Sequence, residues 1–345
     1  MGHRAGVALM LVSHSGPDLS SRAALRLVMQ HLPGVSAVEG MTSLEPSMTS
    51  EPPALRAATN VEGSALRAVR VPDYSREASS GFGGFLDGAQ KVQVFGHFEG
   101  MPIVLGTVSA AVRVRVNRRM TTWGHRQPIV ERKIYLPLRY LPPMVEIAGI
   151  ADGKDDTGWQ IVDTSTADAD GNFPSRHPSH LAERAIRAVD RDREKLEDRL
   201  AEAWCARSEA PLFIDGGISR STDVASSSCA IGVIKSHRTL YVEEDALRIV
   251  LGLRQGERST VFRVAPRSRS SVLSWYLRLR AAEGRDALWG LVRVEVAECD
   301  RPGERADEVS KWLMAEKTPL SLPDGRWDKM VYGVRDCEEF LRAIS

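Results

Sequence analysis

The chain has 345 residues, of which 43% are hydrophobic and 26% are charged, and its formal net charge is +1. These values exclude a disordered or fibrous chain and are typical of a globular protein with one large domain or two smaller ones. No apolar run approaches the roughly 20 residues of a membrane-spanning helix, so we expect no membrane segment. The apolar stretch from Ala5 to Val12 precedes no obvious cleavage site, and we interpret it as a buried segment rather than an export signal.

The cysteines are widely spaced. Cys205, Cys229, Cys299 and Cys337 are the four present, and none lies in a CxxC spacing. This pattern predicts neither a structural zinc site nor a disulfide scaffold, and it favours a reducing, cytoplasmic location. Because the net charge is close to zero, a nucleic-acid partner has to be sought in local clusters of arginine.

The first 80 residues differ in composition from the rest of the chain. We expect 1–80 to form an N-terminal extension, partly loop and partly helical. The run from Gly40 to Pro53 is rich in Ser, Thr, Glu and Met and indicates a loop, with short amphipathic helices expected over 21–32 and 53–69. Residues 81–345 are predicted to form an α/β domain with a mixed central sheet flanked by helices.

Strand-like runs begin at residue 85. Phe85-Leu86-Asp87-Gly88 indicates a strand that stops at Asp-Gly, and further strands are expected over 91–97, 101–105 and 108–116. In the last of these, valines alternate with arginines, which favours a half-buried strand. A helix over 107–119 fits the same residues, and the sequence does not decide between the two.

The clearest helix is expected from His180 to Arg207. Its apolar residues fall on one face at a period of 3.6, with Glu197 at the margin of that face and Glu194 toward solvent. The preceding residues 151–178 are rich in Asp, Gly, Thr and Pro and are predicted to form a surface excursion.

Strands and helices continue to alternate after this helix. Buried strands are expected over 212–216 and 229–235, separated by a Ser/Thr-rich loop. Further apolar segments cover 246–253, 259–264, 271–279 and 288–296, and a final helix is expected over 336–343.

Two Asp-Gly motifs follow matched apolar pairs. Asp87 follows Phe85-Leu86, and Asp215 follows Phe213-Ile214. Two aspartates at neighbouring strand ends would share divalent cations such as Mg²⁺ or Mn²⁺, which prefer carboxylate oxygens. The alternative is a pair of ordinary turns, because Asp-Gly is a common turn signal.

Two further residues are candidates for the same site. Glu197 is a candidate third ligand because it lies at the edge of the buried helix face, although it also fits a charge-rich solvated helix. Lys235 follows an apolar run and is a candidate to hold a scissile phosphate. Its alternative role is that of a surface lysine at a strand end.

The order and spacing of these segments resemble those of the NurA nucleases. The resembling segments are those around Asp87, Glu197 and Asp215, the strand Ile231–Ser236, the strand Val292–Val296 and the residues around Tyr332. The resemblance covers about residues 82–120 and 185–345. It implies a ribonuclease H-like fold, a homodimer, and Mn²⁺- or Mg²⁺-dependent cleavage of DNA, often as a 5′→3′ exonuclease.

The resemblance also implies roles for individual residues. Asp87, Glu197 and Asp215 match the metal carboxylates of the family, and Tyr332 matches a tyrosine near its C-terminus. The chain has no histidine after His237 where the family has a histidine ligand, and Asp336 is the nearest replacement. The residues Ala89 and Gly217 stand where the family has serines.

A partner and a rival function follow from the same resemblance. The family works with a HerA-like hexameric ATPase that translocates DNA, in DNA end processing during repair or in defence against phage. The missing C-terminal histidine leaves open a catalytically inactive ribonuclease H-like adaptor that binds DNA or the ATPase.

Arginine clusters are the candidate contacts for a DNA backbone. The densest cluster comprises Arg254, Arg258, Arg263, Arg267, Arg269, Arg278 and Arg280, and a second comprises Arg113, Arg115, Arg118 and Arg119. Trp275 and Tyr276 lie within the first cluster and are candidates for base stacking, with burial in the core as the alternative.

Overall fold

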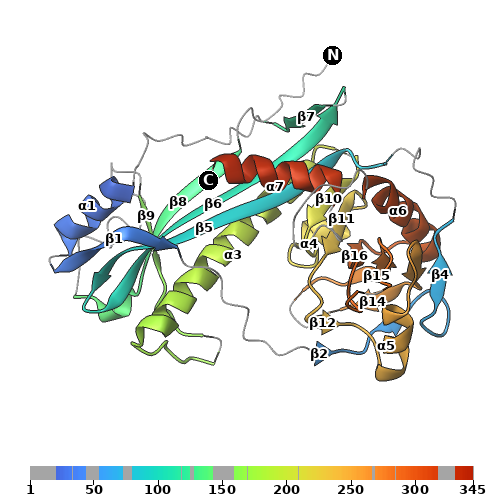
Figure 1. The fold of residues 1–345 in the computed structure, drawn as a ribbon, viewed down its shortest axis with the longest axis horizontal. Coiled ribbons are helices and arrows are strands. Elements are labelled where there is room, and N and C mark those ends of the chain that lie inside the picture. Colours follow the sequence, from blue (N-terminus) through green and yellow to red (C-terminus); the bar gives the residue numbers. More distant parts are fainter. Residues whose placement is uncertain are drawn as a thin grey trace, which may run out of the picture. The chain divides into compact units, whose positions relative to one another are not determined.

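The computed structural model shows an α/β protein whose helices flank a mixed β-sheet (Figure 1). The structure describes residues 21–32, 34–43, 54–72, 80–117, 119–124, 128–142, 159–168, 170–208, 210–265, 269–283, 285–317 and 331–344. Among these residues, no helix has both the length and the apolar character needed to cross a membrane.

The helices and strands have the following bounds. The helices are α1 (Ser21–His31), α3 (Pro178–Cys205), α4 (Thr222–Ser226), α5 (Glu244–Leu251), α6 (Pro302–Glu316) and α7 (Tyr332–Ile344), with a 3-10 turn η1 (Leu138–Tyr140). The earlier strands are β1 (Val35–Ser43), β2 (Ala54–Leu55), β3 (Thr59–Asn60), β4 (Ala68–Arg70), β5 (Gly84–Phe98), β6 (Met101–Val116), β7 (Arg119–Thr122), β8 (Ile129–Leu136) and β9 (Gln160–Asp163). The later strands are β10 (Leu212–Asp215), β11 (Ala230–Ile234), β12 (Thr239–Leu240), β13 (Glu257–Ser259), β14 (Phe262–Val264), β15 (Val272–Arg278) and β16 (Leu291–Val296).

The chain divides into two compact units. The first comprises residues 1–46, 91–107 and 131–189, and the second comprises residues 47–90, 108–130 and 190–345. The expected N-terminal extension, 1–80, therefore contributes residues to both units. Strands β5 and β6 and helix α3 also contribute residues to both.

The first unit has its own apolar core. Strand β1 pairs antiparallel with β5, placing Val35 opposite Phe98, and β8 pairs parallel with β9. Helix α1 confirms the helix expected over 21–32 and packs Ala24, Leu27 and Val28 into this core. Part of the expected surface excursion is also buried there, because Trp159 and Ile161 are only 3% and 7% exposed. That part of the prediction is wrong: β9 joins the sheet by pairing with β8, a partner distant in sequence.

The second unit carries a mixed sheet in the order β3-β14-β15-β16-β11-β10-β5-β6. Strand β10 runs parallel to both β5 and β11, whereas β11–β16, β16–β15 and β15–β14 are antiparallel pairs. Strands that run parallel are joined by helices or long crossovers, and helix α3 precedes β10 accordingly. The three parallel strands β5, β10 and β11 lie side by side in the centre of this order.

The two faces of this sheet are covered by different helices. Phe85, Phe213 and Trp275 point toward α6 and α7, and the Trp275 ring nitrogen donates to the Ser310 hydroxyl of α6 over 3.0 Å. On the opposite face, a Cβ added at Gly84 would lie 2.9 Å from the Trp204 ring, so α3 packs there directly against the strand. Residues that alternate along β5 therefore face two different helical layers.

The predicted long helix and the strands after it are confirmed by α3, β10 and β11. The helix proposed over 53–69 is wrong within the described residues 54–69. That segment forms β2, β3 and the start of β4, which pair with β12, β14 and β13 respectively. Its backbone groups form hydrogen bonds with strands that are distant in the sequence. The periodicity of apolar residues within the segment cannot predict such pairing.

The choice between strand and helix over 107–119 is settled by β6, a strand that continues to Val116. The strand expected to stop at Asp87-Gly88 instead continues to Phe98, so that prediction is wrong. The turn that follows β5 is made by Glu99 and Gly100, whose φ angles of 46° and 80° are typical of a tight hairpin.

Candidate functional site

Asp215 is the last residue of β10. Gly216 follows with a φ of 139°, a conformation that side-chain-bearing residues rarely adopt, and its N–H donates to the Val233 carbonyl of β11 over 3.1 Å. The glycine therefore ends the strand sharply and leaves the Asp215 side chain, 21% exposed, at the carboxyl end of the sheet. This is the local geometry expected for the second Asp-Gly motif.

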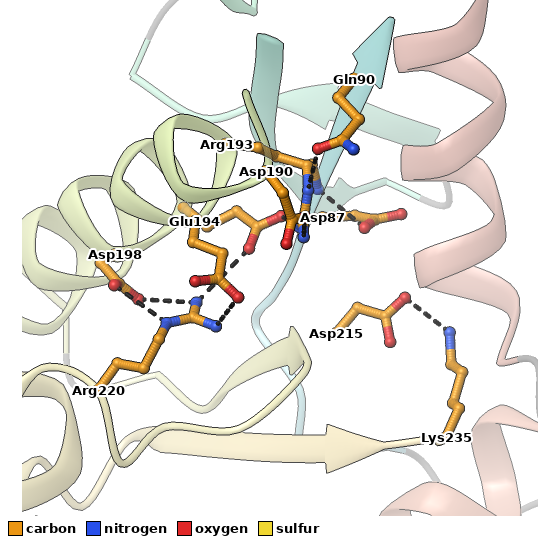
Figure 2. Close-up of polar contacts among 11 residues, drawn as sticks. Asp87, Gln90, Asp190, Arg193, Glu194, Asp198, Asp215, Arg220 and Lys235 are labelled. Atoms are coloured by element: carbon orange, nitrogen blue, oxygen red, sulfur yellow. Dashed lines mark hydrogen bonds and ion pairs between the residues drawn. The ribbon is translucent and has the colours of Figure 1, made fainter. Parts of the chain in front are cut away.

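Asp87 lies beside Asp215 because of the strand register. Leu86 of β5 is the partner of Ile214 of β10, so the two aspartates follow at the next position on adjacent parallel strands. Such strands lie roughly 4.8 Å apart. Alternation along each strand turns both carboxylates to the face that carries Phe85 and Phe213. Figure 2 shows the two side chains on this common side.

Lys235 brings a positive charge to the same place. It follows β11, the third parallel strand, and its Nζ lies 2.8 Å from Oδ2 of Asp215, with only 8% of its side chain exposed. Asp215 and Lys235 thus lie at the carboxyl ends of β10 and β11, and Asp87 lies beside them near the start of β5, which continues past this point (Figure 2). This edge of an α/β sheet is where ligands commonly bind.

The two aspartates have different electrostatic environments. Burial raises the pKa of Asp87 well above its usual range, and the neighbouring Asp215 carboxylate raises it further. The Lys235 ammonium and the N–H of Gly88, 2.8 Å from Oδ1 of Asp87, oppose this rise. Asp87 therefore retains a proton more readily than an exposed aspartate does, and Asp215 has the Lys235 ammonium as its counter-ion.

Glu197 lies on the opposite face of β5. A Cβ added at Gly88 would lie 2.1 Å from Oε1 of Glu197, so Glu197 fills the space where a side chain of residue 88 would be. Successive residues of a strand face opposite sides, so Gly88 faces α3 and Asp87 faces away from it. Only a glycine at this position admits the buried carboxylate of Glu197, which is 4% exposed.

Two arginines hold Glu197. Arg193 of the same helix donates to Oε1 of Glu197, and Nη2 of Arg220 lies 3.6 Å from Oε2. Burial and the Asp215 carboxylate raise the pKa of Glu197, and the two guanidinium groups oppose the rise, so Glu197 is within electrostatic range of the acidic pair. Arg220 also pairs with Asp198 at 3.0 Å and with Glu194 at 3.1 Å, so Glu194 is not simply solvated (Figure 2).

Sequence reasoning paired neither arginine with Glu197. Arg193 precedes Glu197 by four residues, and that spacing on a helix was a usable signal. Arg220 lies in the loop after β10, and only the tertiary structure brings it to α3.

The two C-terminal candidates do not join the acidic pair. Asp336 of α7 is paired with Arg113, whose Nε lies 2.8 Å from Oδ1. Tyr332 is 43% exposed and interacts with Arg115, which forms an ion pair with Glu316 at 2.9 Å.

The four-carboxylate set expected from the resemblance is therefore not assembled. In the part of the chain that the structure describes, no group of three or more His, Cys, Asp or Glu residues is arranged to hold a metal ion. The physical reason is that Glu197 and Asp336 are each neutralised by arginines, and Glu197 faces the other side of β5.

A second buried carboxylate, Glu295, lies beside Gly217. Glu295 of β16, 2% exposed, accepts the N–H of Ile218 over 3.0 Å and is paired with Arg293 at 2.6 Å. A Cβ added at Gly217 would lie 2.9 Å from Oε2 of Glu295. The glycine at 217 therefore fits the close approach of Glu295, which anchors the turn after Asp215.

Two arginines of the segment proposed for DNA are internal, which corrects the prediction for these two, whereas Arg254, Arg263 and Arg269 are exposed. Arg258 is 1% exposed and paired with Glu62 at 2.7 Å and Asp307 at 2.6 Å. Arg278 is fully buried and donates to main-chain carbonyls, among them that of Leu251 over 2.7 Å. Trp275 and Tyr276 are also fully buried, so they belong to the core and not to a stacking surface. Arg118 and Arg267 lie outside the described residues.

The acidic pair by itself suits one small divalent cation. Mg²⁺ is commonly held by one or two carboxylates, with water and substrate phosphates completing its coordination. Asp87 and Asp215 supply two such carboxylates, and because burial and the neighbouring carboxylate raise the pKa of Asp87, a bound cation would favour its charged form. The donor set thus fits a single cation rather than a fully protein-enclosed pair of cations.

The chain matches no protein-family model and no curated protein.

Proposed function

We propose that this protein is a nuclease with a ribonuclease H-like core that cleaves DNA with the help of Mn²⁺ or Mg²⁺. The observation that supports the proposal best is the placement of Asp87 and Asp215 on adjacent parallel strands, with Lys235 on the third. Phosphodiester hydrolysis needs negative ligands for a cation and positive charge for the phosphate, and this edge of the sheet supplies both.

Each residue has a distinct task in this proposal. Asp87 and Asp215 would hold the cation, which supplies Lewis-acid polarisation of the phosphate and activation of water when it is bound. Lys235 lies within hydrogen-bonding distance of Asp215 and would donate to a phosphate oxygen. Arg193 and Arg220 keep Glu197 fixed beneath Gly88 and so maintain the position of β5.

The choice of DNA as substrate comes from the resemblance to the NurA nucleases. From the same resemblance we propose 5′→3′ exonuclease or endonuclease action on DNA ends, a homodimer, and docking on a HerA-like hexameric ATPase. DNA repair and defence against phage are both compatible with this activity.

A cleavage assay tests the proposal. Purified full-length protein is incubated with linear DNA and Mn²⁺, alone and with a HerA-like ATPase. We expect degradation, and a loss of about 10²-fold or more in Asp87→Ala and Asp215→Ala. The matched control is Asp245→Ala, which removes an exposed aspartate of α5 and should leave the rate unchanged. Equal rates in Asp87→Ala and the wild type would contradict the proposal.

A catalytically inactive adaptor is the second candidate. The observation in its favour is that Glu197 and Asp336 are paired with arginines, which leaves two carboxylates for a cation. An adaptor would bind DNA or the ATPase in the presence of a chelator and would not cleave DNA under any of the conditions above. Metal-independent binding without cleavage would therefore replace the nuclease by the adaptor.

A further inference from the structure

Two cysteines distant in sequence meet at one end of the sheet of the second unit. Cys205 is the last residue of α3, and Cys229 immediately precedes β11. Their sulfur atoms lie 3.2 Å apart, and both are free thiols. A disulfide bond is about 2.05 Å long, so side-chain rotations that close roughly 1 Å would bring the sulfurs to bonding distance.

The surroundings of the two sulfurs differ. The pKa of Cys229 is lowered to about 6, first by its hydrogen bond with the Cys205 thiol, then by the Ser227 hydroxyl and by Arg305. The Ser227 hydroxyl lies 3.2 Å from the Cys229 sulfur. The same thiol–thiol hydrogen bond raises the pKa of Cys205. The pair therefore contains one thiolate and one thiol near neutral pH, which is the combination that reacts with oxidants.

The pair is also accessible from one side. Cys229 is 4% exposed, but Cys205 is partly exposed, so a small oxidant can approach the two sulfurs. The other two cysteines lack this arrangement. Cys337 is buried with a raised pKa and lies 3.3 Å from the Ala111 carbonyl, whereas Cys299 is exposed.

We propose that Cys205 and Cys229 form a redox-active dithiol that small hydroperoxides oxidise to an intramolecular disulfide. The Cys229 thiolate attacks one peroxide oxygen and the O–O bond breaks, giving a sulfenic acid and, with hydrogen peroxide, a hydroxide that is protonated to water. The Cys205 sulfur then loses its proton and attacks the Cys229 sulfur. The S–OH bond breaks and the hydroxide leaves as water, so the two thiols are oxidised and the peroxide is reduced.

The disulfide would tie the end of α3 to the start of β11. The chain between the two cysteines contains β10 and Asp215, and β11 leads to Lys235. Closing this loop restricts the unfolded chain, so the oxidised protein should be more resistant to heat than the reduced protein. The proposal concerns the thiols alone and holds whether or not the protein is a nuclease.

The test uses the full-length Cys299→Ser protein, which removes the exposed thiol that would form intermolecular bonds. Protein reduced and then treated with hydrogen peroxide should lose the mass of two hydrogen atoms. Digestion without reductant should give one cross-linked peptide pair containing residues 205 and 229. The melting temperature should rise by about 5 °C or more and return to its reduced value with dithiothreitol.

The matched variants are Cys205→Ser and Cys229→Ser in the same background. In Cys205→Ser, a sulfenic acid at residue 229 should be trapped by dimedone, because no second thiol resolves it. In Cys229→Ser, Cys205 should remain reduced at the same peroxide concentration. The proposal is overturned if peroxide leaves both thiols of the parent protein open to alkylation, or converts Cys229 to a sulfinic acid without a cross-link.

Discussion

Asp87 and Asp215 show how the same residue type acquires two properties from its neighbours. Asp215 has a lysine counter-ion 2.8 Å away and is partly exposed. Asp87 is half-buried, and burial of its carboxyl group together with the adjacent Asp215 carboxylate raises its pKa well above the usual range. Replacing each aspartate by asparagine should therefore have opposite effects on the stability of the folded protein.

Asp87→Asn should stabilise the protein in the absence of divalent cations. The folded protein holds the Asp87 proton more tightly than the unfolded chain, so wild-type stability falls as the pH rises from the unfolded pKa of about 3.9 through the raised folded pKa. An asparagine, which retains an oxygen to accept from Gly88, does not incur this loss. Thermal unfolding in chelator should show a melting temperature a few degrees higher than wild type at about pH 7.5 and equal to it near pH 3.5.

Asp215→Asn is the comparison for this measurement. It removes the carboxylate that lies 2.8 Å from the Nζ of Lys235, a side chain only 8% exposed, and the loss of such a contact costs about 1–3 kcal/mol. The melting temperature at about pH 7.5 should fall. If Asp87→Asn lowered the melting temperature as much as Asp215→Asn does, the different electrostatic environments assigned to the two aspartates would be contradicted.

Gly88→Ala should be destabilising because of Glu197. The new Cβ would lie 2.1 Å from Oε1 and 2.9 Å from Cδ of a buried side chain that Arg193 holds in place. We expect a loss of about 1–3 kcal/mol in the free energy of unfolding, measured with urea. The cost should be smaller when Gly88→Ala is introduced into a Glu197→Ala background, and equal costs in both backgrounds would show that the contact is not the cause.

At the scale of elements, buried arginines join segments that the sequence keeps far apart. Arg258 of β13 connects Glu62, which precedes β4, with Asp307 of α6. Its position in an arginine-rich stretch suggested a surface for DNA, but its guanidinium group is enclosed by these carboxylates and by the Gly303 carbonyl. Arg258 therefore helps to hold α6 against β13 and the segment that precedes β4.

Arg258→Ala should lower the free energy of unfolding by about 3 kcal/mol or more, because it removes the buried guanidinium that pairs with two partly buried carboxylates. Urea denaturation followed by circular dichroism measures the effect. The matched control is Arg263→Ala, which removes an exposed arginine paired with Glu298 from the neighbouring strand. The control should unfold at the same urea concentration as the wild type. A similar loss of stability in both variants would contradict the distinction between a buried and an exposed arginine.

At the scale of the whole molecule, the acidic pair should couple cation binding to stability. A ligand that binds only the folded state stabilises it by about 2.7 kcal/mol at a hundredfold excess over its dissociation constant. Mn²⁺ should therefore raise the wild-type melting temperature by several degrees, with about one ion bound per chain by calorimetry.

The variants identify the ligands of that cation. Asp87→Asn and Asp215→Asn should lose the shift caused by Mn²⁺, whereas Glu197→Gln should retain most of it because Glu197 faces the other side of β5. If a folded Glu197→Gln variant lost the rise in melting temperature caused by Mn²⁺, Glu197 would have to be a third ligand of the cation. This measurement requires no nuclease activity.

Local sequence patterns predicted a large part of the fold. The 3.6-residue period identified α3 and placed Glu197 at its buried margin, and the apolar runs identified β10 and β11. Local patterns failed where distant partners decide the structure. Residues 54–70 form short strands because the edges of β12, β14 and β13 accept them, and β5 continues past Asp87 because its pairing partners extend beyond that residue.

The sequence by itself determined the α/β class, the central helix and the two Asp-Gly motifs, because these depend on periods and on residue types close together along the chain. Only the tertiary structure decided which charges meet. Strand register set Asp87 beside Asp215, and the packing of α3 against Gly88 placed Glu197 on the other face with Arg193 and Arg220. Electrostatic partners are fixed by distances in space, and residues such as Arg220 and Asp336 acquire their partners from elements far away in the sequence.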